Sequence, residues 1–291
     1  MKIKIHNTHK KAFLTALITL ICLGSLVYWI YSKFYVSTDD AYVNANIVQI
    51  APRVTGQVEH LYIKNNQFVT AGQPLFDLDP ALYQVAVDQA KAQLSMAEAK
   101  KMLAQNTNAR TYALVKKNVA SAQEGDDTQT NLQSAIAQVA LDTANLAQAE
   151  LNLSYTKVTA PTSGWVTNVT LRIGNIAPAN QPLFALISNN EFWLDANFKE
   201  TELEHLSPGQ RADITVDTYP NHPFSGVVES MSGGSGSAFS LLPPENATGN
   251  WVKVTQRVPV RIRILNPDPK LPLRIGTSAT ATIWVRPWAR S

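Results

Sequence analysis

The stretch Gly56–Leu78 reads GQVEHLYIKNNQFVTAGQPLFDL, and it returns at Gly164–Leu186 as GWVTNVTLRIGNIAPANQPLFAL. The copies align without a gap, each residue of the first matching the residue 108 positions later, as 56 matches 164. Gly56 with Gly164, Val58 with Val166, and the Gln-Pro-Leu-Phe runs at 73–76 and 181–184 are identical. Apolar residues alternating with Gly, Asn and Pro predict short strands and tight turns. One copy cannot bury its own apolar face, so the two copies are predicted to form a small two-sheet sandwich.

Between the copies, residues 80–157 are rich in Ala, Gln, Leu and Lys and have no proline after Pro80. Asp79 is a natural helix N-cap, with Pro80 at the first helical position. Ser121 and Glu124 form a capping-box pattern that restarts a helix after a break near 118–120. The segment therefore predicts an antiparallel helical hairpin, and an arm of about 38 residues would reach roughly 57 Å.

Two sets of residues with 4–3 spacing suggest how the two helices of the hairpin pack. The first set is Val85, Gln89, Ala92, Met96, Ala99 and Leu103. The second set is Ala135, Val139, Asp142, Leu146, Ala149 and Leu153. Both sets are interpreted as heptad seams of a coiled coil.

Beyond residue 190 the pattern returns to strands, at 192–198, 211–216, 226–231, 251–264 and 278–285. Their spacing and turn residues predict a small antiparallel β-barrel, to which the alternating stretch 38–49 adds a strand. Residues 232–250 form a loop rich in Gly, Ser and Pro that is long for a compact domain. It contains an apolar island at 238–242.

The N-terminus predicts a membrane anchor. Ala12–Ile30 is a run of 19 residues without charge, and as a helix it would span roughly 28 Å, about one hydrocarbon core. Lysines precede it and Asp39 and Asp40 follow, so the positive-inside rule places residues 1–11 in the cytoplasm and the body from about residue 33 outside. The alternative is a cleaved signal peptide, but the apolar run is long and no cleavage-site pattern follows it.

Composition and motifs exclude several classes of function. Residues 1–33 carry five lysines and no acid, and the remaining 20 basic and 22 acidic residues leave a slightly acidic body, which argues against nucleic-acid binding. The only cysteine is Cys22, within the anchor. Three of the histidines, His60, His205 and His222, have no partner at metal-ligand spacing, and His6 and His9, three residues apart, are interpreted as part of a solvated basic tail. Asp77 and Asp79 suit capping better than acid–base chemistry, and Gly233–Gly236 lacks the Lys of a phosphate loop. No enzyme is predicted.

This order of anchor, half-module, hairpin, half-module and barrel resembles the membrane fusion proteins of the HlyD/EmrA type. The motifs that carry the resemblance are Thr38–Val43 (TDDAYV), Ala160-Pro161-x-x-Gly164-x-Val166, and Gly234–Arg263. The hairpin is shorter than in typical EmrA proteins and nearer to that of aromatic-acid efflux adaptors. The implied organisation is a cytoplasmic tail (1–11), a transmembrane helix (12–31), a barrel strand (38–49), a lipoyl-like half-module (50–79), the hairpin (80–157), a second half-module (158–188) and the barrel (189–286) with its loop (232–250).

The resemblance implies a single-pass inner-membrane protein with a periplasmic body. It would assemble into a ring and link an inner-membrane transporter, most often of the major facilitator type, to a TolC-like outer-membrane channel. Two other functions are open: an envelope-organising protein, and a subunit that captures substrate for the transporter. Lipoyl carriers need a lysine on the turn joining their half-modules, and the hairpin occupies that junction, so no cofactor is expected.

Channel-binding adaptors share an Arg, a Leu four residues on and a Ser seven further, and Arg110, Leu114 and Ser121 have this spacing at the predicted tip. The resemblance therefore implies that these three residues contact the channel. Each has a simpler alternative: Arg110 as a solvated charge, Leu114 as part of the hairpin seam and Ser121 as a helix cap.

The apolar island of the loop 232–250 is open to two interpretations. Phe239, Leu241 and Leu242 could pack against the barrel. Alternatively, they could contact the inner-membrane transporter or its substrate, because the barrel is expected to lie near the membrane.

Overall fold

The computed structural model describes residues 17–20, 22–23, 25, 34–239, 254–268 and 270–285. The chain divides into two compact units, Ile47–Asn189 and the combination of Met1–Asn46 with Asn190–Ser291. Most of the predicted transmembrane stretch 12–31 lies outside the described residues, and its described residues are helical. Within the described part of the chain, no helix has the length and hydrophobicity needed to cross a membrane.

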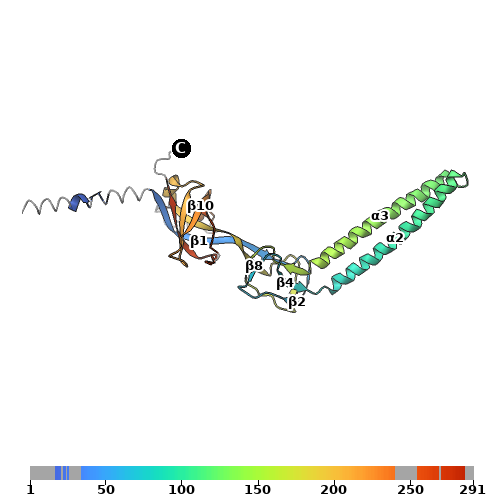
Figure 1. Cartoon of the computed structure of the whole chain (residues 1–291), viewed down its shortest axis with the longest axis horizontal. Coiled ribbons are helices and arrows are strands. Elements are labelled where there is room, and N and C mark those ends of the chain that lie inside the picture. Colours follow the sequence, from blue (N-terminus) through green and yellow to red (C-terminus); the bar gives the residue numbers. More distant parts are fainter. Residues whose placement is uncertain are drawn as a thin grey trace, which may run out of the picture. The chain divides into compact units, whose positions relative to one another are not determined.

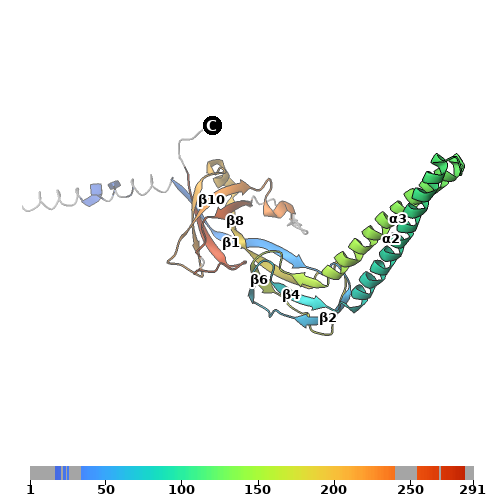
Figure 2. The ribbon, with the colours of Figure 1, turned by 45° about the vertical axis from the view of Figure 1, so that its right-hand side comes forward.

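The unit Ile47–Asn189 contains the predicted sandwich (Figure 2). One sheet has the order β5-β4-β2-β7, and the other joins β3, β6 and the first part of β8. The strands are β2 (Gly56–Leu61), β3 (Phe68–Val69), β4 (Pro74–Leu78), β5 (Lys157–Thr159), β6 (Gly164–Thr167), β7 (Ile176–Ala177) and β8 (Phe184–Lys199). The sandwich predicted from the repeat is confirmed.

Each repeat copy pairs its strands with strands of the other copy, and the two sets of pairings are equivalent. Gly56 of β2 pairs with Ala177 of β7, and the equivalent residues Gly164 and Val69 pair between β6 and β3. Turn hydrogen bonds repeat as well: the Gly72 N–H donates to the Ala160 carbonyl, and the Asn180 N–H to that of Pro52, both at 2.8 Å. The 108-residue offset is thus an approximate twofold relation in space.

The sandwich core contains the equivalent residues of both copies. Val58 and Val166, Leu78 and Leu186, and Val69 and Ala177 are all buried. The rings of Phe76 and Phe184 meet edge to face, with centroids 6.0 Å apart, a favoured geometry for aromatic pairs. Neither copy could bury these side chains alone, because each copy supplies half of the core.

Helices α2 (Ala81–Lys116) and α3 (Ala122–Ser154) form the predicted antiparallel hairpin and run side by side in Figures 1 and 2. Ser121 caps α3 with the predicted capping box, since its Oγ accepts the Glu124 N–H and the Glu124 carboxylate accepts the Ser121 N–H. Helix α2 begins one residue later than predicted, and Asp79 accepts the Ala81 N–H.

The predicted seam of α3 is confirmed, whereas that of α2 is wrong. The buried and half-buried residues of α2 follow a different set: Tyr83, Val87, Ala90, Leu94, Ala97, Lys101, Ala104, Asn108, Thr111 and Val115. Of these, Tyr83 packs against the sandwich core at the base of the hairpin. Val85, Met96 and Leu103 of the predicted set are instead 64%, 60% and 64% exposed. Both sets in α2 have 4–3 spacing and differ in register by two residues, and both contain small residues, Ala90 and Ala97 in the less exposed set and Ala92 and Ala99 in the exposed one.

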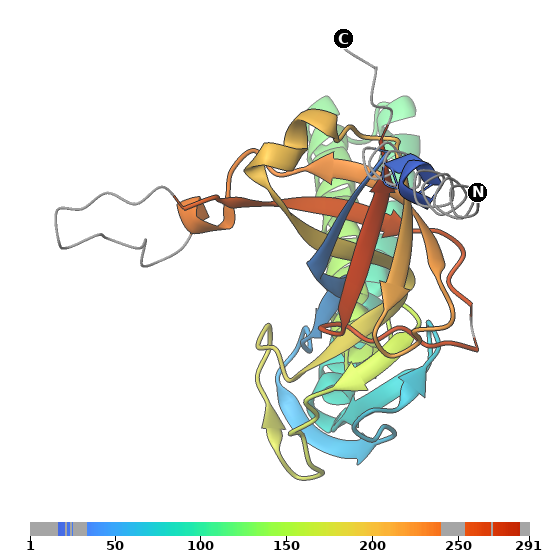
Figure 3. The same ribbon diagram turned by 90° about the vertical axis from the view of Figure 1, so that its left-hand side faces the viewer.

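The other unit is the predicted antiparallel barrel (Figure 3). Its strands follow the order β1-β12-β9-β10-β11-β8, and a further β1–β8 pairing returns the sheet to its first strand. They are β1 (Tyr35–Ile50), β8, β9 (Arg211–Val216), β10 (Phe224–Met231), β11 (Arg257–Ile264) and β12 (Ser278–Trp284), with short 3₁₀ helices η1 (Glu200–His205) and η2 (Gly236–Phe239). Alternate residues of each strand, such as Val43, Ile214 and Ile262, fill the interior.

The Thr38–Val43 motif holds β1 against the neighbouring strands of the barrel. The Thr38 hydroxyl donates to the Asn197 carbonyl of β8 at 2.9 Å. Asp40 accepts a hydrogen bond from the Asn197 side chain and forms an ion pair with Arg257 of β11 at 3.0 Å. Ala41 and Val43 are buried in the core, so the motif has a structural role in closing the barrel.

Candidate functional site at the hairpin tip

The turn at the end of α2 is a Schellman motif. The Val119 N–H donates to the Leu114 carbonyl at 3.0 Å, and the Asn118 N–H donates to that of Val115 at 3.0 Å. Asn118 has a positive φ of 56°, the left-handed conformation that this motif requires at its C′ position and that Asn tolerates. Together with the Ser121 capping box, the motif gives both helix ends at the tip their hydrogen-bond partners.

The three residues predicted to contact a channel lie around this turn. Arg110 and Leu114 lie one turn apart on α2, and Ser121 begins α3. The Arg110 side chain is exposed and donates only to the Asn106 carbonyl of its own helix, at 3.2 Å. Leu114 is 44% exposed, between the seam positions Thr111 and Val115, so the seam alternative for Leu114 is wrong. The capping alternative for Ser121 is confirmed, although its side chain is also exposed.

Three further tip residues were not predicted from the sequence. Val119 is 71% exposed and Tyr112 is 58% exposed, and Lys116 lies over the Tyr112 ring with its Nζ 4.8 Å from the centroid. The sequence did contain a signal for Val119: it is an apolar residue directly after Asn118, within the predicted break between the helices, where side chains face solvent. The tip thus presents apolar, aromatic and cationic groups together, a composition common in protein interfaces.

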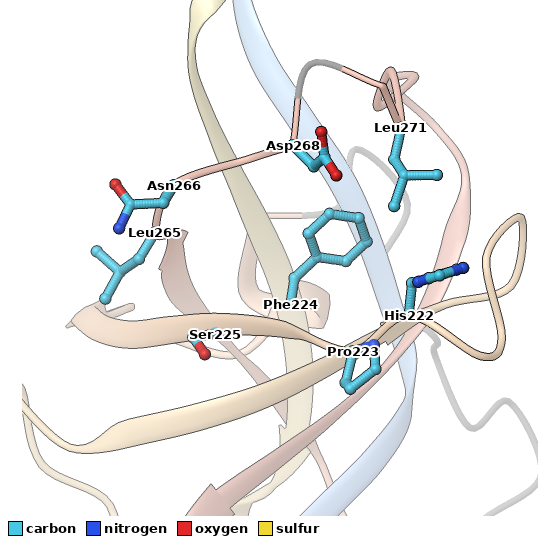
Figure 4. Close-up of a pocket in the computed structure, with 8 residues that line it drawn as sticks. All are labelled: His222, Pro223, Phe224, Ser225, Leu265, Asn266, Asp268 and Leu271. Atoms are coloured by element: carbon cyan, nitrogen blue, oxygen red, sulfur yellow. The ribbon is translucent and has the colours of Figure 1, made fainter.

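The barrel unit has a pocket of about 400 Å³ between the β9–β10 and β11–β12 connections. In Figure 4 the Phe224 ring lies centrally, with Asp268, Leu271 and His222 around it. The lining residues are His222, Pro223, Phe224, Ser225, Leu265, Asn266, Asp268 and Leu271. Phe224 is only 7% exposed, so the accessible wall of this pocket is more polar than apolar, with Asp268 as its one carboxylate.

The residues predicted to contact the transporter are only partly described. Phe239 ends the 3₁₀ helix η2, but its side chain and Leu241 and Leu242 lie outside the described residues. No group of three His, Cys, Asp or Glu side chains within the described ranges is placed to hold a metal ion.

The comparisons with known proteins agree with this architecture. Residues 46–189 match the family model "RND MFP, barrel-sandwich hybrid domain", and residues 191–285 match "AAEA-like beta-barrel domain". The chain is 34% identical to the multidrug export protein EmrA of Haemophilus influenzae over 92% of this chain and 81% of that protein. It is 32% identical to the colistin resistance protein EmrA of Acinetobacter baumannii over 94% of this chain and 93% of that protein.

Among solved structures, the periplasmic adaptor protein EmrA aligns with a TM-score of 0.51 at 19% identity, covering 87% of this chain and 99% of that one. The fold and the hairpin define a periplasmic adaptor, in which a split sandwich carries a hairpin and a barrel. The chain belongs to the membrane fusion proteins of the HlyD/EmrA type, the non-enzymatic accessory proteins of efflux pumps.

Proposed function

We propose that this protein is the inner-membrane-anchored periplasmic adaptor of a drug efflux pump. It links a transporter of the major facilitator type to a TolC-like outer-membrane channel and works as a ring of several copies. The observation that carries the proposal is the hairpin. Its 36-residue helix α2 reaches about 54 Å at a rise of ~1.5 Å per residue, far longer than is needed to connect the two halves of the sandwich.

The proposed channel contact is the tip face formed by Arg110, Leu114 and Ser121. Arg110 has no ion-pair partner within the hairpin, every residue of which is described, so its guanidinium is available to carboxylates or carbonyls of another protein. Leu114 adds an exposed apolar group one turn away. The rigid turn fixes these groups in place, which lowers the entropic cost of binding.

Channel capture by the full-length adaptor tests this proposal. Arg110→Glu is expected to reduce the amount of channel that co-purifies, because charge reversal leaves a repulsive group at the contact. The circular dichroism spectrum of the variant should match that of the wild type, since Arg110 is exposed. Normal channel recruitment by the folded variant would refute the tip contact.

Variants of Ser121 separate its two roles. Ser121→Asn keeps an N-cap, so it should preserve the stability of α3 while changing the group presented to the channel. Ser121→Ala removes both the N-cap and the hydroxyl presented to the channel, and the loss of the cap should destabilise the chain by about 1 kcal/mol. If Ser121 contacts the channel, both variants lower channel capture; if it is only a cap, Ser121→Asn captures the channel normally.

The anchor and the loop 232–250 define the proposed inner-membrane end. The uncharged run at 12–31 is proposed to span the inner membrane once, with residues 1–11 in the cytoplasm. Phe239, Leu241 and Leu242 are proposed to contact the transporter or its substrate. Hydrogen exchange of the full chain with and without the transporter would show added protection across residues 236–244, and unchanged exchange there would contradict the contact.

The pocket of the barrel favours substrate capture as a second candidate function. The exposed Asp268 carboxylate in this pocket would attract a cationic substrate. Binding of a fluorescent aromatic cation to the full chain should weaken with Asp268→Asn, whereas Asp217→Asn, an exposed acid outside the pocket lining, should leave binding unchanged. Equal binding by both variants would remove this candidate.

A further inference from the structure

Six strand ends meet at the end of the barrel where the chain enters from the proposed anchor. Tyr35, the first residue of β1, pairs with Trp284, the last residue of β12. The start of β9 and the end of β10 follow in the sheet, and the start of β11 pairs with the end of β8. We call this end of the barrel the anchor end.

Chain length ties the anchor end to the membrane. The uncharged run proposed to span the membrane stops at residue 31, and Phe34 is the third residue after it. An extended chain covers at most ~3.6 Å per residue, so Phe34 lies within about 11 Å of the end of the span. The Val285 N–H donates to the Phe34 carbonyl at 2.9 Å, so β12 ends at a similarly short distance from the bilayer.

Exposed apolar side chains gather at the anchor end. Among the described residues of the barrel unit that follow the anchor, five large apolar side chains are exposed. Four of them lie at or next to the anchor end: Phe34 before β1, Met231 at the end of β10, Val254 before β11 and Trp284 at the end of β12. The fifth, Tyr42, pairs with Ser278 at the opposite end of β12. This grouping differs from the single exposed apolar residues that are ordinary on protein surfaces.

Trp284 presents hydrocarbon rather than polar surface. Its indole N–H donates to the Asp213 carboxylate at 2.6 Å, and its ring meets that of Tyr35 edge to face, with centroids 6.4 Å apart. Trp284 remains 41% exposed, although its polar group is bonded within the barrel. Arg211, at the start of β9, lies beside Trp284, one step beyond the last pair of β9 with β12. Trp and Tyr near a basic residue are typical of surfaces that meet the headgroups of a bilayer.

The sequence continues this composition beyond β12. Residues 286–291 read RPWARS, which adds one tryptophan and two arginines. These residues lie outside the described part of the chain, but they follow directly on Val285 at the anchor end. Aromatic and basic residues are thus supplied to this end both by β1 and by the segment around the end of β12.

Charge alone does not explain the anchor end. The 3₁₀ helix η1 follows β8 there and carries Glu200, Glu202 and Glu204, which offset the nearby Lys199 and Arg211. Anionic lipids attract clusters of basic residues, and the described residues of the anchor end form no such cluster. A contact with lipid at this end would therefore depend on its aromatic side chains.

We infer that the anchor end of the barrel is a second contact with the membrane, in which Phe34, Tyr35 and Trp284 enter the headgroup region of the bilayer. The partner is lipid, because so few residues separate the proposed span from Phe34. A single span leaves the periplasmic body free to swivel, whereas a second contact made by β12 fixes the height and tilt of the barrel. The inference rests on the proposed inner-membrane anchor.

Depth-dependent fluorescence quenching of the full-length chain tests this contact. The protein is reconstituted into phosphatidylcholine vesicles in which some acyl chains carry a nitroxide, either close to the headgroup or near the chain end. Phe34→Cys and Trp284→Cys, each in a Cys22→Ser background, carry a small fluorescent label. Both labels are expected to be quenched, and more strongly by the shallow nitroxide than by the deep one.

Tyr42→Cys is the matched control. Tyr42 is an exposed aromatic residue of the same strand, β1, but it lies seven residues from Tyr35, about 23 Å at ~3.3 Å per residue. A label at Tyr42→Cys should show no quenching by either nitroxide. Equal quenching of the labels at positions 284 and 42, or none at either position, would overturn the inference.

A label at Arg211→Cys shows whether the aromatic side chains cause the contact. Phe34→Ser combined with Trp284→Ser should abolish the quenching of this label, whereas Tyr42→Ser should leave it unchanged. Trp284→Phe keeps an aromatic ring but loses the hydrogen bond to Asp213, so it should retain the quenching. A loss as complete as with the two serine changes would show that this hydrogen bond positions the barrel, and would contradict the contact of the ring with lipid.

The natural Cys22 keeps the anchor and the barrel contact distinguishable. A label on Cys22 of the otherwise unchanged chain should be quenched most by the deep nitroxide, because Cys22 lies midway along the run 12–31. Quenching at Cys22 without quenching at position 284 would leave the anchor standing and refute the barrel contact. Quenching at position 284 without quenching at Cys22 would refute the proposed span and leave the barrel contact standing.

The lipid headgroup separates aromatic insertion from attraction between charges. Adding phosphatidylglycerol, an anionic lipid, to the phosphatidylcholine vesicles should leave the quenching at positions 34 and 284 unchanged. A strict requirement for phosphatidylglycerol would overturn the aromatic contact, because the membrane would then be held by basic residues.

Discussion

Single residues of the sandwich show why the repeat keeps particular side chains. Gly164 is identical to Gly56 in the other copy, and a Cβ atom at Gly164 would come within 2.0 Å of the Ile187 carbonyl oxygen. That approach leaves no room for a side chain between β6 and β8. Asn66 and Gly174 are also equivalent, and both have positive φ, of 62° and 89°, so each repeat turns in the left-handed conformation at the same position.

Gly164→Ala is expected to destabilise the chain by about 2–4 kcal/mol, because the added methyl group must push backbone apart. Urea unfolding of the purified full chain would measure the loss. Gly233→Ala is the control, since a Cβ atom at Gly233 meets nothing within 4 Å. Equal stability of the two variants would show that the sandwich can shift to accept the methyl group.

Tyr62 has a raised pKa in the folded protein. Its hydroxyl donates to the Asp77 carboxylate at 2.6 Å, and this hydrogen bond is the main reason that the pKa of Tyr62 is raised above 10.0. Because the folded state favours the neutral phenol, the stability that this bond contributes is present at neutral pH and is lost as pH rises through the raised pKa. Titration followed by ultraviolet absorbance should show a tyrosine that ionises above pH 10.0, and Asp77→Asn should lower the pKa of this tyrosine.

At the scale of elements, the α3 seam set, which is otherwise apolar, contains the carboxylate of Asp142. Asp142 of α3 is 7% exposed and accepts hydrogen bonds from Gln138 and Asn145 of its own helix, at 3.0 and 3.5 Å. A polar residue at a seam position lowers stability and favours one pairing register over others. Both partners of Asp142 lie in α3, whereas Asn108 of α2 is hydrogen bonded across the hairpin to Thr128 and Gln129, so the register between the helices is marked by Asn108.

Asp142→Leu is expected to raise the free energy of unfolding by about 1–3 kcal/mol, since a buried polar group is replaced by packing. Val139→Ala, one turn away in the same seam, should lower it by about 1–2 kcal/mol. Thermal unfolding followed by the helical circular dichroism signal measures both. A lower stability for Asp142→Leu would mean that its hydrogen bonds contribute more than the apolar packing that replaces them.

At the scale of the whole molecule, the proposed contact with the channel is expected to depend on salt. The charges of α2 and α3 are mostly exposed, so their attraction to another protein is screened once the Debye length falls to about 3 Å at 1 M salt. Channel capture by the full chain should therefore weaken in high salt. Capture that rises with salt would show that apolar contact, not charge, holds the channel.

The sequence by itself determined the parts of this protein and their order. The 108-residue repeat, the capping box at Ser121 and the alternating strands beyond residue 190 are local patterns, and local hydrogen bonding and side-chain periodicity are enough to predict a sandwich, a hairpin and a barrel from them. The α3 seam was predicted correctly because Val139, Leu146 and Leu153 give its 4–3 pattern the larger apolar side chains.

Only the tertiary structure decided which face of α2 is buried. Helix α2 carries two 4–3 patterns, at Val85–Leu103 and at Tyr83–Val115, and periodicity cannot rank them. Side-chain size does not rank them either, because Ala90 and Ala97 of the buried set correspond to Ala92 and Ala99 of the exposed set. Contacts with distant residues mark the buried face: the Tyr83 hydroxyl donates to the Thr55 carbonyl, and Asn108 is hydrogen bonded to Thr128 and Gln129 of α3. Such contacts depend on atoms brought together from distant parts of the chain.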